Sequence, residues 1–413
     1  MILKMNKNLI IKHIKKSVLY KIVKSIYYFF YFKVIFYLNR IIFSKAKVSS
    51  NKIVVDNFAG RGFGDNPKYI IEALLKKRLD LDIVWEVSDM KIPMPPGIRK
   101  VKYGSLKAYR ELMTAKVWID NIKSSIKPDK RTSQFYLQTW HGGIGLKASE
   151  KQVERSLPRS YVIAAKRDAS MTDVMLSDSK WTTDLYSKWF WYSGKIEKTG
   201  FPRNDILINP SKETIDGVYN FYNIPRGKKI ILYAPTFRDK RNDLSIYQFD
   251  FSLIASACAN QFIEEYVVLI RLHPNVVELA KQSNFYNFDN NIINASNYPD
   301  MQELIVASDV LITDYSSCMF DAMLANKKVF LLAKDYDEFI TEDRHLLFDI
   351  KNDLPFSFSD SEDELIKHIN LFNNTFYIKQ IEKFKNKVDI IEDGHASERV
   401  ADIICNEVDK DNL

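Results

Sequence analysis

Two histidines follow predicted strands at positions where they could act on a bound ligand. His141 comes after the apolar run 135–137 and precedes two glycines, and His273 comes two residues after the predicted strand 267–271. A histidine titrates near neutrality and can accept a proton from a reacting hydroxyl, and glycines let a ligand approach the backbone. A single histidine more often has a structural role, and that alternative stays open for both residues.

A pair of serines stands between a predicted strand and a predicted helix. The apolar run 310–312 precedes Ser316 and Ser317, and helical spacing resumes at Met319. Backbone N–H groups and the positive end of a helix dipole at such a turn suit a phosphate or a diphosphate. The alternative is an ordinary serine N-cap.

The elements that would position these residues alternate as strand and helix in two series. In the first half, strands are predicted at 53–55, 82–87, 116–119 and 135–137, with a helix at 68–78. In the second half, strands at 229–233, 267–271, 310–312 and 329–332 alternate with helices at 301–308 and 319–324. This pattern predicts two doubly wound, Rossmann-like α/β domains, and polar turns at the strand ends predict a ligand cleft between them.

Domain boundaries follow from the same pattern. We predict a basic helical segment at 1–47, an acceptor domain at 48–208, a linker at 209–227, a donor domain at 228–390 and a C-terminal helix at 391–413 that crosses back to the first domain. The glycine-rich turn 60–67 lacks the third glycine of a dinucleotide fingerprint, so no NAD site is predicted.

Composition narrows the class of protein. The chain has 413 residues, of which 46% are hydrophobic and 27% charged, as in a folded protein of two domains. Its three cysteines, Cys258, Cys318 and Cys405, are far apart, which indicates a reducing compartment without structural zinc.

The net charge of +8 is concentrated at the N-terminus, because every charged residue before Asp56 is basic. The body of the protein is therefore slightly acidic, which disfavours nucleic-acid binding.

Residues 1–47 combine lysines with many aromatic and aliphatic residues, and the least charged span, 25–39, is too short to cross a bilayer as a helix. We predict that this segment attaches the protein to an anionic membrane surface on the cytoplasmic face of the bacterial cell membrane. The alternative is a basic helix packed on the body.

Six segments, taken in order, resemble the CDP-glycerol glycerophosphotransferase family of teichoic acid primases and polymerases, which have a GT-B-type fold. They are Trp140-His141-Gly142, Gly200 to Asp205, Ala234-Pro235-Thr236-Phe237-Arg238, Arg271-Leu272-His273-Pro274, Thr313 to Ser317 with Phe320-Asp321, and Asp393-Gly394 with Ala396 to Arg399. Each is weakly specific alone. Together they cover about residues 53–405 and are highly specific for the family.

The resemblance implies transfer of a polyol phosphate, with glycerol phosphate favoured, from CDP-glycerol or CDP-ribitol to a hydroxyl of a lipid-linked saccharide or polyol-phosphate acceptor, with release of CMP. His141 would be the base, and His273, the other catalytic residue, would hold the diphosphate with Arg203 and the serines. Asp321 would accept bonds from ribose hydroxyls, and Arg238 would have a supporting role. The implied donor-binding residues are Trp140, Gly142, Gly143, Ile144, Arg203, Pro235, Thr236, Arg271, Leu272, Ser316, Ser317 and Asp321.

This chain differs from many members of the family in the loop after His141. Many family members have a Thr-Pro pair after Trp-His-Gly, whereas this chain has Gly143-Ile144-Gly145-Leu146 before Lys147. The loop borders the expected acceptor side, so the acceptor and the polyol stay open. The spacing of Asp335 and Asp337 matches that of some metal-dependent transferases, but histidines, arginines and helix ends already suit the phosphates, and no metal ion or other cofactor is expected.

Two other functions share much of this pattern. A GT-B glycosyltransferase that uses a nucleotide sugar would have the same cleft, and a non-catalytic membrane-associated assembly protein could retain the fold. The sequence leaves open whether one polyol phosphate or many are added.

Overall fold

The protein is described here from a computed structural model. The structure describes residues 36–43, 45–124, 126–238, 244–273, 276–277, 288–343 and 345–410, together with Val23, Ile26, Phe30 and Val34. Most of the predicted membrane segment 1–47 lies outside these residues, as does Pro274 of the second histidine motif.

In the part of the chain that the structure describes, seven strands form the first sheet, in the order β3-β2-β1-β4-β5-β6-β7. All neighbouring strands are parallel. The strands are β1 Ser49–Val55, β2 Asp82–Val87, β3 Ile98–Lys102, β4 Ala115–Asp120, β5 Phe135–Gln138, β6 Val174–Leu176 and β7 Lys195–Glu197.

Helices cover both faces of this sheet. Ile53 and Val55 pack with residues of α4 (Asp65–Lys77), whereas Val54 packs on the other side with residues of α5 (Leu106–Thr114). Successive strand residues point to opposite faces, so an unbroken apolar run is what a sheet covered on both sides requires. The remaining helices of this part are α3 Phe36–Phe43, η2 Glu150–Ser156, α6 Arg159–Met171 and α7 Lys180–Trp189.

The second sheet repeats the topology of the first. Six parallel strands of the described chain run in the order β10-β9-β8-β11-β12-β13. They are β8 Lys228–Tyr233, β9 Glu265–Ile270, β10 Ile292–Asn294, β11 Val310–Thr313, β12 Lys328–Leu332 and β13 Ser357–Ser359. Both sheets therefore reverse their strand order once, between β1 and β4 and between β8 and β11, which is where doubly wound sheets bind ligands. The predicted fold class is confirmed.

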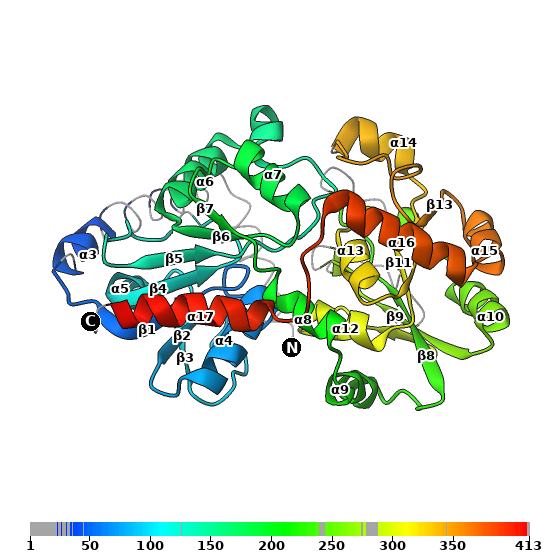
Figure 1. The fold of residues 1–413 in the computed structure, drawn as a ribbon, viewed down its shortest axis with the longest axis horizontal. Helices are drawn as coiled ribbons and strands as arrows, with labels where there is room; N and C mark the ends of the chain where they lie inside the picture. Colours follow the sequence, from blue (N-terminus) through cyan, green and yellow to red (C-terminus); the bar gives the residue numbers. More distant parts are fainter. Residues whose placement is uncertain are drawn as a thin grey trace, which may run out of the picture.

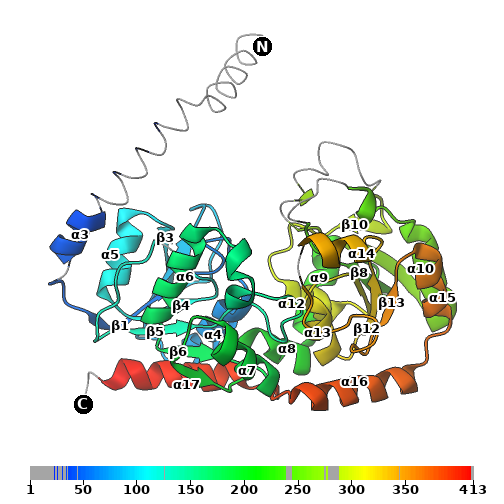
Figure 2. The same cartoon turned by 90° about the horizontal axis from the view of Figure 1, so that it is seen from above.

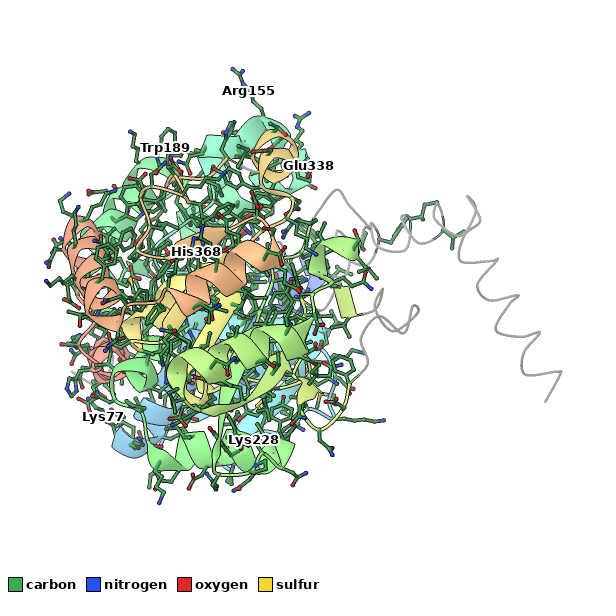
Figure 3. The ribbon with its side chains drawn as sticks, turned by 90° about the vertical axis from the view of Figure 1, so that its right-hand side faces the viewer. Lys77, Arg155, Trp189, Lys228, Glu338 and His368 are labelled. Atoms are coloured by element: carbon green, nitrogen blue, oxygen red, sulfur yellow. The ribbon has the colours of Figure 1, made fainter. Side chains whose placement is uncertain are left out.

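The two domains lie side by side (Figure 1). The helices of the second domain are α10 Phe251–Phe262, α12 Met301–Ala307, α13 Cys318–Leu324, α14 Tyr336–Glu338, α15 Glu362–Asn370 and α16 Asn374–Val388, with the short elements η4 Ser245–Tyr247 and η5 Phe339–Asp343. His368, on α15, is labelled in Figure 3, in which the second domain faces the viewer.

The last helix, α17 (Ala396–Asp409), returns to the first domain. It contacts α4, β1 and β4, and Val400, Ala401, Ile404 and Val408 are buried in the first hydrophobic core. Figure 2 shows α16 and α17 along the same edge of the molecule, α16 beside the second domain and α17 beside the first. The chain thus crosses between the domains a second time, near Ile390.

The segment predicted as a linker contains a helix. The short elements η3 (Pro202–Asn204) and α8 (Asp205–Ile208) lead to α9 (Lys212–Tyr222), which contacts α12. Val218 and Tyr219 are buried in the core of the second domain. Because α9 buries only these two residues, the sequence pattern of this segment did not predict a helix packed on the second domain.

Among the described residues, no helix is both long enough and apolar enough to cross a membrane.

Candidate active site

A cavity of about 440 Å³ lies between the two domains. The first domain contributes residues 140–149 and part of α7, and the second contributes residues 235–237, His273, residues 315–317 and Phe339. Of the predicted site residues, those that line the cavity are Trp140, His141, Gly142, Gly143, Ile144, Pro235, Thr236, His273, Ser316 and Ser317.

The ring of His141 is oriented by the end of β4. Its Nδ1 lies 2.7 Å from the carbonyl oxygen of Asn121. Because a carbonyl can only accept, Nδ1 carries the hydrogen, and Nε2 is the nitrogen that can accept a proton. Burial lowers the pKa of His141 from its ordinary value, so the neutral ring is the dominant form at pH 7. His141 is therefore prepared to act as a general base.

Trp140 turns the chain sharply at the end of β5. Its φ of +57° lies in the left-handed region, which costs a residue with a side chain roughly 1–3 kcal/mol. Three hydrogen bonds stabilise this turn: the Trp140 N–H donates to Gln138 at 2.9 Å, and its carbonyl accepts from Thr139 at 2.8 Å and from Asn66 at 3.2 Å.

The loop after His141 crosses to the second domain. Ile144 and Leu146 are buried in the core of the second domain, and Leu347 N–H donates to Leu146 O at 2.8 Å. A Cβ at position 143 would lie 2.1 Å from Asp178 Oδ2, so a side chain at this position would clash with Asp178. This contact gives a physical reason for glycine where many family members have threonine.

On the second domain, a buried arginine supports the loop after β11. The Arg238 guanidinium forms ion pairs with Asp314 at 2.8 Å and with Asp335 at 2.7 Å, and lies 4.7 Å from the ring centre of Tyr315. The Thr236 N–H donates to Asp314 at 2.8 Å. These contacts link the loop 314–317 to the segment after β8, and they engage the Asp335 carboxylate of the Asp335–Asp337 pair.

The second histidine lies on the opposite side of the cavity from the first domain's loop. His273 follows β9 and stacks on Phe237, with ring centres 5.4 Å apart and an interplanar angle of 18°. The His273 side chain is exposed, and together with the two serines it lines the cavity from the second domain.

Four predicted donor-binding residues do not line the cavity. Arg271 donates to the Tyr298 carbonyl at 2.6 Å, and Leu272 is buried. Arg203 and Asp321 form an ion pair with each other, with the closest N–O distance 3.0 Å. Donor contacts by these four residues stay a prediction.

Several lining residues were missed by the motif analysis. Tyr186 and Phe190 are spaced as i and i+4 along α7 and its end, and the Tyr186 hydroxyl donates to Gly142 O at 2.9 Å. Their helical spacing within an aromatic-rich segment was a usable signal, although such spacing more often reflects core packing than a binding site. Phe339, which stacks on Tyr315 with ring centres 3.7 Å apart, has no such signal in its sequence context.

A comparison with known protein families identifies the same family as the sequence motifs. The family model of CDP-glycerol:poly(glycerophosphate) glycerophosphotransferases matches residues 37–406. The chain belongs to this family. The resemblance that the six segments indicated is confirmed.

Relatives within the glycerophosphotransferase family differ in length. A teichoic acid glycerol-phosphate transferase of Staphylococcus aureus is 31% identical over 371 residues, which cover 86% of this chain and 93% of the relative. A teichoic acid poly(glycerol phosphate) polymerase of Staphylococcus epidermidis is 30% identical over 372 residues, covering 87% of this chain. The chain spans only 51% of that polymerase, about half of its length.

Solved glycerophosphotransferase-family structures have the same architecture. A structure of the wall teichoic acid polymerase TagF has a TM-score of 0.78 and 28% identity, and the match covers 91% of this chain and 94% of the TagF chain.

Proposed function

We propose that the protein transfers a polyol phosphate, glycerol phosphate in the first instance, from a CDP-activated donor to a hydroxyl of a lipid-linked or polymer acceptor. The reaction would serve the synthesis of teichoic acid or a capsule-type surface polymer. The observation that carries the proposal is the state of His141, which lines the interdomain cavity with Nδ1–H bonded to Asn121 O and Nε2 able to accept a proton.

In the proposed mechanism, the first domain provides the base and the second domain holds the donor. The acceptor oxygen attacks the phosphorus that bears the polyol, and its proton passes to His141 Nε2. The bond between this phosphorus and the bridging oxygen breaks, and CMP leaves with that oxygen and its electron pair. His273 and the backbone around Ser316 and Ser317 hold the diphosphate, because phosphoryl transfer depends chiefly on positioning and on stabilisation of charge.

The donor is supported by the family and by a relative. A TagF variant, 28% identical to this chain, has been solved after a soak with CDPG. Related chains include a poly(ribitol-phosphate) polymerase of Bacillus spizizenii, 28% identical over 370 residues, so CDP-ribitol belongs in the same test.

The test is release of CMP from CDP-glycerol and CDP-ribitol in parallel, by purified protein with a lipid-linked disaccharide acceptor and EDTA. The proposal expects CMP together with a phosphopolyol on the acceptor. Turnover of a nucleotide sugar without reaction of either CDP-polyol would instead support a glycosyltransferase. Absence of donor binding would support a non-catalytic assembly protein.

We also propose that residues 1–47 attach the protein to the cytoplasmic face of the membrane. On α3, the side chains of Tyr37, Leu38, Ile41 and Ile42 are each more than half exposed, and the basic residues of the segment favour an anionic surface. The full chain should sediment with anionic vesicles, less so at high salt, and a chain lacking 1–47 should not. Equal sedimentation of both chains would refute the attachment.

A further inference from the structure

The buried side chain of Arg203 bridges the two domains outside the cavity lining. The side chain of Arg203, on η3, is 7% exposed. Its Nη1 donates to Asp65 Oδ2 at 2.9 Å and to the carbonyl oxygen of His141 at 3.0 Å. Its Nη2 donates to both carboxylate oxygens of Asp321, at 3.2 and 3.0 Å.

On the first domain, Arg203 belongs to a polar scaffold around the base. The Arg203 N–H donates to Asn66 Oδ1 at 3.1 Å, and the Asn66 amide donates to the Trp140 carbonyl. Asp65 accepts from Asn121, whose own carbonyl accepts from His141. The glycine-rich turn before α4, which fits no dinucleotide site, thus ends in Asp65 and Asn66, two residues that hold the His141 segment.

On the second domain, Asp321 connects Arg203 to the serine loop. Asp321 lies on α13, which begins at Cys318 directly after Ser317. Asp321 as a whole residue is 5% exposed, and its carboxylate also accepts a hydrogen bond from the Gln302 side chain at 2.9 Å. The two Nη groups of the planar guanidinium thus donate to different domains, Nη1 to the first and Nη2 to the second. The guanidinium therefore joins the backbone of the base to the helix that follows the expected diphosphate loop.

We propose that Arg203 is a positioning residue, which sets the distance and angle between His141 and the loop 316–317 through the His141 carbonyl and the Asp321 carboxylate. This inference deepens the proposed function and rests on it for the roles of His141 and the serines. It replaces the predicted role of Arg203 as a diphosphate ligand, because both Nη groups already donate to protein oxygens and the side chain lies outside the cavity lining.

The first test separates positioning from donor binding. In Arg203→Lys the charge stays, but one ammonium cannot replace two separate nitrogens held in a plane, one donating to each domain. We expect turnover to fall about 100-fold, the order seen for displacement of reacting groups by about 1 Å, while the Kd for CDP-glycerol, measured by calorimetry, changes less than about threefold. A loss of donor affinity as large as the loss of turnover would overturn the proposal.

A matched control is another buried ion pair between the domains. Lys68, on α4, lies 2.8 Å from Asp300 and 2.5 Å from Glu303, and no hydrogen bond of its side chain reaches the described residues 140–141 or α13. Lys68→Met should therefore affect stability more than turnover. Equal losses of turnover in Lys68→Met and Arg203→Lys would contradict a specific role of Arg203.

A double variant tests whether Arg203 acts through the base. With His141→Ala already in place, adding Arg203→Lys should lower the residual rate less than about threefold, since residues that act as a unit are not additive. Full additivity would overturn the proposal.

A second measurement does not depend on turnover. Hydrogen exchange in Arg203→Lys should rise together in segments 138–146 and 313–321, on both domains, and should stay at the wild-type level there in Lys68→Met. A rise confined to 201–205 would overturn the proposal. If wild-type protein releases no CMP, the proposed function fails, whereas the exchange result still decides whether Arg203 links the two segments.

Discussion

Replacement of His141 by alanine is the most direct test of the reaction. A positioned general base contributes typically 10²- to 10⁴-fold to a rate, which corresponds to about 2.7–5.4 kcal/mol in the barrier. The Nδ1–H bond to Asn121 O and the burial of the ring remove the cost of selecting the correct tautomer and protonation state, so we expect a loss in the upper half of that range. Donor affinity should change little, because the proton that His141 accepts belongs to the acceptor.

The pH profile provides a second, independent signature. A protonated ring cannot act as a base, and burial lowers the pKa of His141 below its ordinary value of 6.5. The acid limb of kcat/KM should therefore fall below pH 6.5, and the rate should be level from there through pH 7.5. In His141→Ala the residual rate should lack this limb.

The assay is single-turnover release of CMP, with donor affinity measured separately by calorimetry. His395→Ala is a suitable control, because His395 is exposed and does not line the cavity. The assignment is refuted if His141→Ala loses donor affinity but turns over bound donor at the wild-type rate. An acid limb that persists in the variant would also contradict it.

Three further predictions concern stability, and each is measured by urea unfolding. Burial raises the pKa of Glu86 to about 8, so the folded state binds more protons than the unfolded state in the intervening range. The free energy of unfolding should fall from pH 5.5 to 8.5 by at most about 3 kcal/mol from this group, and Glu86→Gln should flatten that slope. The Thr236 hydroxyl is buried without a hydrogen-bond partner among the described residues, so Thr236→Val should stabilise the protein by about 1 kcal/mol; a loss of stability would contradict this. Ile404→Ala, in the buried face of α17, should cost about 2–5 kcal/mol, against less than about 0.5 kcal/mol for the exposed Leu371→Ala.

The long, buried elements were predictable because their sequence patterns are strong. The apolar runs of β1, β2, β4, β8 and β11 are continuous, as they are in parallel sheets buried on both faces. The three-residue strands β7, β10 and β13 have no continuous apolar run of this length, because each lies at the edge of its sheet, where few residues need to be apolar. Helix α9, within the predicted linker 209–227, gave no helical signal for a related reason, since only Val218 and Tyr219 of it are buried.

The sequence alone determined the family, the two-domain α/β architecture and the segments that meet at the cavity, because motif residues and strand ends are local features of the chain. It could not decide the partners of those residues. In the structure Arg203 pairs with Asp65 and Asp321, which lie 138 and 118 positions away in the chain. Whether a charged side chain faces a cavity or a counter-charge depends on how the two domains are packed against each other. That packing arises from contacts distant in sequence, such as α17 on the first domain and the Ile144 loop on the second, and no local pattern encodes it.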